Sequence, residues 1–400
     1  MTIRHTRRVF LSAATMMAAA VAVTACGSPQ DTASGGGETA PVKVGLVYSQ
    51  SGPLASYGKQ YIEGFKAGLD FATKGTGKVG DRKIELTEVD DAGDPAKAVS
   101  AAKDLIGKGA KIIAGSTSSG VALQVAPIAA QNKVLFISGP AATDAVTGAN
   151  KYTFRSGRQS YQDVVTAKSF IGDATGKKVV VFAQDGAFGD ANEAAVKAVI
   201  GGAGATVSSV RAPASATEFT PFASQIKAAK PDLLFVAWAG TTAPAMWQTL
   251  DQQGVLASTT VVTGLDIRAS WPTFGAAGSK ISFLSHYFDG ASDTEAAKAA
   301  KAKIPGGTLD LFHPDGFAAA QMVVRAAQEG GDDVDKMIKA LEGWQFDSIK
   351  GQMTIRPEDH ALLQPMYQAK LSGSGTAYTA TAQKTLTGDE TAPPVTQMKG

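Results

Sequence analysis

Short apolar runs alternate with longer helical patterns along nearly all of this 400-residue chain, and this alternation limits the fold more than any other feature. Residues 42–47 have the pattern of a strand, and apolar side chains recur at helical intervals from 61 to 72. Residues 83–89 then alternate as a strand does. This order is typical of a mostly parallel sheet covered by helices, so we predict an α/β fold.

The alternation continues along the chain and restarts once. Asp94 and Pro95 predict the start of a helix over 95–107, because one caps the helix and the other suits its first position. Further strands are predicted at 111–115, 134–138, 178–183, 205–211, 233–238, 259–264 and 281–287, with helices at 121–131, 316–327 and 334–341. A hairpin-like pair of strands, 351–355 and 366–371, closes the pattern. Two such units with a returning C-terminal part predict two lobes.

The N-terminal segment has the composition of an export signal. Arg4, Arg7 and Arg8 precede an uncharged apolar stretch over 9–25, which is short for a membrane span. Small residues then lead to Cys26, the one cysteine in the sequence. The segment resembles the lipobox of bacterial lipoproteins, in which that cysteine is acylated and becomes the mature N-terminus. The arginine pair also resembles a twin-arginine signal, so the general secretory route and the twin-arginine route both stay open.

Composition limits the partners of the exported part. The signal removes three arginines from a total of 38 basic and 36 acidic side chains, so the mature chain is near neutral. That balance argues against nucleic acid and against a polybasic membrane contact. Residues 27–40 are small, polar and glycine-rich, which is typical of a flexible tether. With no second cysteine for a disulfide, a hydrophobic core must hold the domain together.

Polar loops follow the predicted strands at the edge where ligands collect in open α/β sheets. In order they are SQSGPLASYG over 49–58, DDAGD over 90–94, GSTSSG over 115–120 and GPAAT over 139–143. The third and fourth are rich in hydroxyls and lie just before helices, where free N–H groups suit a carboxylate. Each alone would also serve as a cap or turn. Two from adjacent strands favour a shared anion site.

The ordered series SGPLASYG, GSTSSG, SGPAAT, FRSGRQSYQD and QDGAFGD resembles the type I periplasmic binding proteins of the branched-chain amino-acid (leucine/isoleucine/valine) group. The later segment GQMTIRPEDHALLQPMYQAKL resembles that group's C-terminal part. The resemblance covers nearly all of residues 41–375. It implies two lobes, each a mostly parallel sheet flanked by helices, with the ligand closed between them. Three hinge crossings are expected near Arg155, His286 and Phe346.

The resemblance also implies a ligand site. A hydroxyl of Ser119 or Ser118, together with Thr143, would hold a carboxylate. The carbonyl of Ala141 and the carboxylate of Asp266 would take an ammonium group. The remaining ligand-binding positions are Tyr57, Phe188 and Thr241.

Several residues depart from the family pattern. The leucine binders have tyrosines where this chain has Phe188 and the pair Thr241-Thr242, so two phenolic hydroxyls are missing. Arg268 lies two residues beyond Asp266 and could bind a second ligand carboxylate or pair with Asp266 instead. Tryptophans in apolar runs are more often core, so among the four in the chain we expect Trp271, in a polar loop, to be the best pocket candidate and Trp247 and Trp344 to be core.

The parts that an enzyme needs do not occur in the sequence. There is no HExxH motif, no GxSxG elbow and no Cys/His cluster, so zinc hydrolysis and the hydrolase triad lack their residues. The GSTSSG loop has no following lysine, so it is not a nucleotide P-loop. We therefore expect no catalytic residue, no metal and no cofactor.

These observations together predict an exported substrate-binding lipoprotein of an ABC importer. It would bind a small amino acid of the branched-chain type by hinge closure, as a monomer on the outer side of the cell membrane, and deliver it to a permease. The alternatives are a small aromatic or aliphatic carboxylate as ligand, or a ligand sensor in place of a transport subunit. We expect a signal peptide over 1–25, a lipid-anchored tether over 26–40, a first lobe from 41–155 with 288–345, a second lobe from 156–287 with 346–390, and a tail over 391–400.

Overall fold

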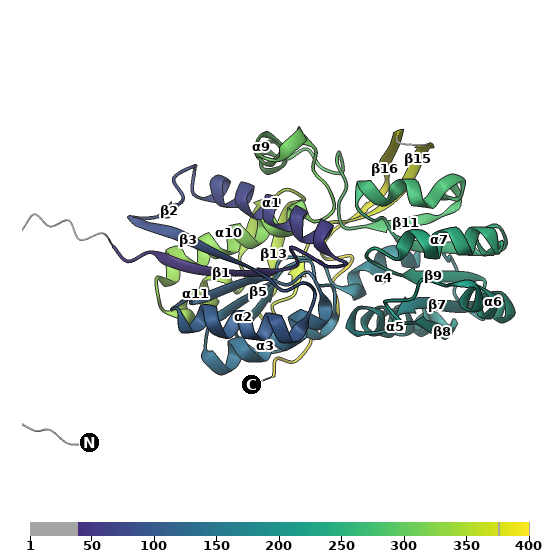
Figure 1. The fold of residues 1–400 in the computed structure, drawn as a ribbon, viewed down its shortest axis with the longest axis horizontal. Coiled ribbons are helices and arrows are strands. Elements are labelled where there is room, and N and C mark those ends of the chain that lie inside the picture. Colours follow the sequence, from purple (N-terminus) through teal and green to yellow (C-terminus); the bar gives the residue numbers. More distant parts are fainter. Residues whose placement is uncertain (1–38, 375–376, 400) are drawn as a thin grey trace, which may run out of the picture. The chain divides into compact units, whose positions relative to one another are not determined.

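The computed structural model describes residues 39–374 and 377–399. The signal peptide, Cys26 and almost all of the tether lie outside the described residues. Within the described part, no helix is both long and apolar enough to span a membrane. The described chain forms two mostly parallel sheets flanked by helices, and a smaller third sheet (Figure 1).

The first sheet has six strands in the order β2-β3-β1-β4-β5-β6. All neighbours pair in parallel except β2 and β3. Its strands are β1 (Val42–Tyr48), β2 (Lys78–Val79), β3 (Arg82–Asp90), β4 (Ile112–Gly115), β5 (Leu135–Ser138) and β6 (Thr153–Arg155). The helices that pack on it are α1 (Ala55–Ala72), α2 (Pro95–Gly107), α3 (Ser119–Asn132), α10 (His313–Gly330) and α11 (Val334–Leu341). We call this sheet with its helices the first lobe.

The central strands β1, β4 and β5 of the first sheet are buried on both faces because they carry apolar residues in succession rather than in alternation. Leu46 and Ile112 pack with α1, α10 and α11 in one cluster. The next residues along the same strands, Val47 and Ile113, pack with α2 and α3 in another. Successive side chains of a strand point to opposite faces, so each strand supplies both cores.

The second sheet has seven strands in the order β16-β15-β11-β10-β9-β7-β8. β15 pairs in antiparallel fashion with both its neighbours, and the other pairings are parallel. Its strands are β7 (Lys178–Gln184), β8 (Thr206–Ala212), β9 (Leu233–Ala237), β10 (Thr260–Gly264), β11 (Ser282–Ser285), β15 (Met366–Ser374) and β16 (Ala377–Leu386). One face packs on α4 (Ser160–Lys168) and α5 (Ala187–Val199), the other on α6 (Thr220–Ala229), α7 (Ala243–Gln252) and α8 (Val255–Ser258). We call this assembly the second lobe.

Three passages of the chain join the two main sheets. They run from β6 to β7, from β11 to α10 with α9 (Glu295–Lys303) on the way, and from β14 (Leu362–Leu363) to β15. The strand order thus places the third passage at residues 364–365, later in the chain than the crossing expected near Phe346. Phe346 itself packs in the first-lobe core.

The predicted pairing of 351–355 with 366–371 is wrong. β13 (Gly351–Ile355) pairs with β12 (Gln345–Ser348) and with β14 in a three-stranded sheet. Its buried side chains Met353 and Ile355 share a cluster with the first lobe. β15 pairs with β11 and β16 instead. The lobe boundaries remain a prediction, and for residues 346–363 this burial favours the first lobe.

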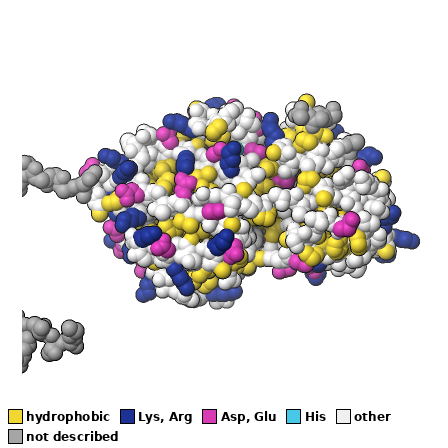
Figure 2. Space-filling model, viewed as in Figure 1, with side chains coloured by type: hydrophobic (Ala, Val, Ile, Leu, Met, Phe, Trp, Pro, Cys, Tyr) yellow, Lys and Arg dark blue, Asp and Glu magenta, His cyan; other side chains and the backbone are white. Residues whose placement is uncertain are grey.

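The fold class is confirmed. Figure 2 shows basic and acidic side chains interspersed over the face in view. This distribution agrees with the near-neutral balance of the sequence, because steering of a polyanion requires charge of one sign gathered on one face.

Candidate functional site

A cavity of about 550 Å³ is lined by loops that follow the strands of both sheets. β1, β3, β4 and β5 contribute the loops on the first-lobe side, and β7 to β11 those on the second-lobe side. The carboxyl ends of parallel strands are where open α/β sheets bind ligands. The volume suits a small organic molecule.

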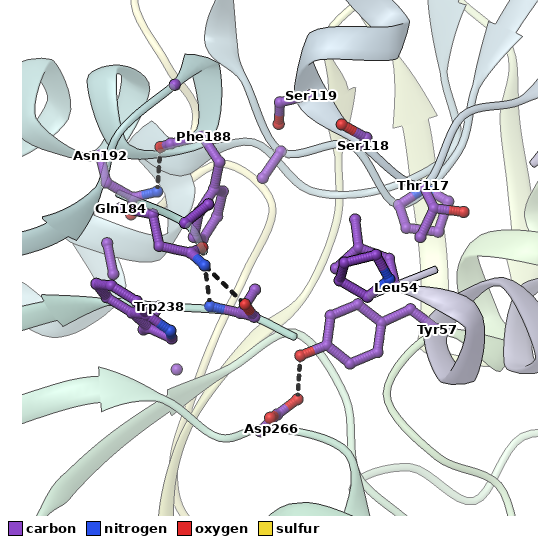
Figure 3. A pocket seen from close by; sticks show the side chains of 18 of the residues that line it. Leu54, Tyr57, Thr117, Ser118, Ser119, Gln184, Phe188, Asn192, Trp238 and Asp266 are labelled. Carbon is purple, nitrogen blue, oxygen red and sulfur yellow. Dashed lines mark hydrogen bonds between the residues drawn. The ribbon is translucent and has the colours of Figure 1, made fainter. Parts of the chain in front are cut away.

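The first-lobe wall is the turn from β4 into α3. Ser118 occupies the N-cap position of α3, yet its side chain caps no backbone N–H. The first N–H groups of a helix have no partner within the helix, and here they belong to Ser119 and Gly120, which line the cavity. Figure 3 shows Ser118 and Ser119 together on this side. Two hydroxyls and a helix start therefore face the cavity without a basic side chain between them, an arrangement that suits a carboxylate.

The wall is held in place by contacts between loops. Gly115 ends β4 with φ +124°, and a Cβ there would lie 2.1 Å from the carbonyl oxygen of Val47. Only glycine allows the two strands to end this close together. Beyond it, the Ser49 N–H donates to Thr117 Oγ1 at 3.2 Å, which ties the first loop to the third. The backbone, rather than long side chains, thus sets the position of the hydroxyls.

Ala141 and Thr143 do not line the cavity. Both are buried, at 1% and 2% exposure, and they lie behind the wall. The Arg155 guanidinium donates to the carbonyl of Ala141 at 2.8 Å and to that of Thr143 at 3.2 Å. The Thr143 N–H donates to Ser119 Oγ at 3.2 Å. These contacts indicate that Ala141 and Thr143 support Ser119, and the direct ligand roles expected for them remain untested predictions.

The second-lobe wall consists of larger side chains. Phe188, the second residue of α5, and Trp238, just after β9, are half-buried and line the cavity (Figure 3). Trp238 packs against Phe182 at 5.3 Å between ring centroids and donates from Nε1 to Thr242 Oγ1 at 3.0 Å. Thr241 also lines the cavity but is exposed. This wall is therefore mainly aromatic.

Gln184 fixes the loop that bears Trp238. Its Nε2 donates to the Ala239 carbonyl at 2.9 Å, and its Oε1 accepts from the Ala239 N–H at 3.1 Å. A side-chain amide that pairs with both backbone groups of one residue acts as a short extension of the sheet. Figure 3 shows these bonds of Gln184 among the side chains that line the cavity.

Tyr57 and Asp266 meet across the cavity. Tyr57 belongs to α1 and donates its hydroxyl to Asp266 Oδ1 at 2.8 Å, and it accepts from the Gly240 N–H at 3.3 Å (Figure 3). Its ring lies 4.6 Å from that of Phe312. Burial raises the pKa of Asp266, and it raises the pKa of the Tyr57 hydroxyl well above its ordinary value. The phenol is therefore protonated at neutral pH and acts as a donor toward Asp266.

The floor of the cavity holds charged residues that the sequence reading did not assign to the site. Arg158 donates to the Pro140 carbonyl at 2.8 Å, and its Nε lies 3.3 Å from Asp163 Oδ2. His286, at the second passage, also lines the cavity. Burial, and then the positive charge of Arg158, hold the pKa of His286 well below its ordinary value. The imidazole is therefore neutral at pH 7 and brings no charge to a ligand.

Further buried charges lie beneath the floor. His286 Nε2 is 3.7 Å from Asp315 Oδ2. Burial raises the pKa of Asp315 to about 6 and lowers that of Lys350 to about 8, while each group's charge opposes the shift of the other. Lys350 donates to Gln364 at the third passage. The region where the passages meet is thus a buried ionic cluster.

One sequence prediction next to Asp266 is wrong, and one of the two roles left open for Arg268 is not found. Trp271 does not line the cavity: it is 1% exposed, packs in the second-lobe core and donates to the Asp266 carbonyl at 2.6 Å. Arg268 makes none of the ion pairs found among the described residues, and its guanidinium lies 5.2 Å from the Trp271 ring centroid. Asp266 therefore is not neutralised by Arg268. Trp247 is core, as predicted.

The match to known families decides the class of protein. The family described as periplasmic binding protein matches residues 41–377. The chain belongs to this family.

Similar proteins and solved structures are consistent with this family. A Leu/Ile/Val-binding protein of Rhizobium johnstonii is 27% identical over 325 residues, which cover 79% of this chain and 87% of the relative. The crystal structure of an ABC-type branched-chain amino acid transporter protein from Rhodopseudomonas palustris is 32% identical, with a TM-score of 0.73 over 90% of this chain and all of that one. A solute-binding protein of R. palustris in complex with 4-hydroxybenzoate is 25% identical, with a TM-score of 0.79 over 87% of this chain and 97% of that one. The resemblance to the branched-chain amino-acid group is confirmed.

In this periplasmic binding protein, six of the eight predicted ligand positions line one cavity. They are Tyr57, Ser118, Ser119, Phe188, Thr241 and Asp266. Of the lining residues that were missed, Arg158, Gln184, Trp238 and His286 lie at strand ends or in the turns that follow, and Asp163 lies in the first turn of α4. That position in the sequence was the available signal, because such turns face the ligand edge of the sheet.

Proposed function

We propose that this protein is the extracytoplasmic substrate-binding lipoprotein of an ABC importer and that it captures a small organic carboxylate between its lobes. The observation that carries the proposal is the pairing of two unlike walls around one cavity. Ser118, Ser119 and the start of α3 offer hydrogen bonds to an anion. Phe188 and Trp238, opposite, offer apolar surface. A ligand with a carboxylate at one end and an apolar body fits both.

Closure of the lobes would link binding to delivery. Three passages join the two lobes in the described chain, and such a small number of connections suits a hinge. A permease that recognises the closed form would receive loaded protein in preference to empty protein. Acylation of Cys26 would keep the protein at the outer side of the membrane, and a monomer is sufficient because one chain supplies both walls.

Two classes of carboxylate fit. An amino acid is favoured by Asp266, a half-buried acid that lines the cavity and makes none of the ion pairs found among the described residues, and by relatives named Leu/Ile/Val-binding. An aromatic carboxylate without an amine is favoured by the ring-lined wall and by the similar R. palustris protein in complex with 4-hydroxybenzoate.

A thermal-shift screen tests the proposal. The protein is refolded from denaturant to remove any ligand carried through purification, then mixed with amino acids, their deaminated acids, aromatic acids and the matching primary amides. A ligand at about 100 times its Kd stabilises the folded state by about 2.7 kcal/mol. We expect at least one acid to raise the Tm while its amide does not. Equal shifts with acid and amide, or none with any acid, would contradict the proposal.

A further inference from the structure

One side chain joins the lobes inside the cavity. Tyr57 lies in α1 of the first lobe, whereas Gly240 and Asp266 follow β9 and β10 of the second lobe. The Gly240 N–H donates to the Tyr57 hydroxyl at 3.3 Å, and that hydroxyl donates to Asp266 Oδ1 at 2.8 Å. The phenol thus donates its single O–H and also accepts one hydrogen bond. The contact is therefore a bridge between lobes.

The second-lobe side of this bridge is held in place. Gln184 pairs with both backbone groups of Ala239 and so fixes the peptide that precedes Gly240. Gly240 has φ +90°, and a Cβ there would lie 3.2 Å from the Pro53 carbonyl of the first lobe. Glycine thus allows the two loops to approach closely. Around the bridge, apolar side chains of both lobes form one small cluster: Leu54, Tyr57, Ala239, Ile267, Leu311 and Phe312.

The same bridge occupies Asp266. Its Oδ1 accepts from the Tyr57 hydroxyl and from the Ile267 N–H at 2.7 Å, and the Ser270 side chain also bonds to the carboxylate. Several donors on one carboxylate satisfy its charge without a cation. An ammonium group would have to displace the phenol to reach this oxygen, and it would open the contact between the lobes in doing so.

We propose that Tyr57, Gly240 and Asp266 form a latch that closes the lobes and that, by occupying Asp266, makes the cavity select carboxylates without an ammonium group. This inference rests on the proposed function, since it assigns the ligand class of the same cavity. Tyr57 is then a specificity-determining residue: it contacts the second lobe, and its hydroxyl occupies the carboxylate that a ligand's ammonium group would otherwise bind. An ammonium group brought into the cavity would lose its hydration without full compensation.

The test compares matched ligand pairs by isothermal titration calorimetry on the refolded protein. The pairs are leucine with 4-methylpentanoate and phenylalanine with 3-phenylpropanoate, which differ only in the amine. We expect the wild type to bind the amine-free acid at least about tenfold more tightly. In Tyr57→Phe, Asp266 loses its phenol donor, so the preference should shrink by a similar factor. In Asp266→Ala, which removes the acceptor of the latch, both members of a pair should weaken together.

A control variant and the contrary results complete the test. Tyr378→Phe removes a phenol that bonds to the Gly275 carbonyl in the second lobe, away from the cavity lining, and should leave the preference unchanged. A wild type that prefers the amino acid, or an Asp266→Ala variant that weakens only the amino acid, would overturn the latch while the proposed function stands. Absence of binding by every acid would overturn both.

Discussion

The two walls of the cavity are built by different means. The first-lobe wall is a helix start with short hydroxyl side chains, positioned by backbone contacts such as that of Gly115 with Val47. The second-lobe wall is made of long side chains, chiefly Phe188 and Trp238. A backbone site holds one chemical group in one geometry, whereas aromatic side chains can be exchanged with little change to the fold. We infer that the first lobe fixes the ligand's carboxylate and the second lobe distinguishes its body.

The largest effect is expected where the first wall is supported. Arg155 is 1% exposed and donates to the carbonyls of Ala141, Thr143 and Arg158. Arg155→Met would leave those acceptors and the nearby Asp144 without their cation, so the free energy of unfolding should fall by about 3–5 kcal/mol. Chemical denaturation measures this change. Arg268→Met, at an exposed arginine, should cost no more than about 0.5 kcal/mol, and equal losses in the two variants would contradict this account of the wall.

The next effect concerns the first wall itself. Ser118→Ala and Ser119→Ala together remove two hydroxyl donors from the carboxylate site. Hydrogen bonds to charged groups contribute about 1.5–3 kcal/mol each, so Kd for an acid should rise by at least about tenfold. The discrimination between an acid and its amide should fall as well. Calorimetry with both ligands checks this, and a loss that is the same for acid and amide would contradict the assignment of this wall to the carboxylate.

The second wall should respond differently. Phe188→Ala removes half-buried aromatic surface, which should weaken the acid by about 1–2 kcal/mol, somewhat less than full burial of a phenylalanine is worth. Because the hydroxyls are untouched, discrimination between the acid and its amide should be preserved. The same titrations measure both quantities. Loss of that discrimination in Phe188→Ala would contradict the assignment of the carboxylate to the first-lobe wall alone.

The last effect depends on pH and is expected beneath both walls. The pKa of Asp315 is about 6 in the folded chain against an ordinary 3.8, mainly because of burial. The folded state therefore retains a proton that the unfolded chain releases, and the stability from this group, full below pH 3.8, is lost as pH rises through about 6. Asp315→Asn should flatten the fall in stability over that range by up to about 3 kcal/mol, since the shift is about two pKa units and one unit corresponds to about 1.36 kcal/mol. Tm measured against pH for both proteins checks this, and parallel curves would contradict it.

The sequence predicted local elements better than their partners. The helix over 95–107 has the predicted bounds, because Asp94 accepts from the N–H groups of Ala96 and Lys97 and Pro95 fits the first turn. The pairing of 351–355 was wrong because alternation identifies a strand but not its neighbour in space. Trp271 was misplaced for a similar reason: a polar stretch of sequence does not exclude a buried ring.

The two walls also differ in how well their residues could be predicted from the sequence. Ser118 and Ser119 could be predicted since they follow a strand and open a helix within six residues of sequence. Gln184, Trp238 and Arg158 lie at or just after strand ends, but their contacts with Ala239, Phe182 and Pro140 join separate segments of the chain and could not be predicted. The latch between Tyr57 and Asp266 joins positions 209 residues apart, and no local pattern indicates it.

A crystal structure of the refolded protein with the tightest-binding acid from the thermal-shift screen tests the central claim most directly. The account predicts that the ligand carboxylate lies within hydrogen-bonding distance of the Ser118 and Ser119 hydroxyls and the first N–H groups of α3, with the ligand's apolar body against Phe188 and Trp238. A ligand bound in the opposite orientation, or outside this cavity, would contradict it.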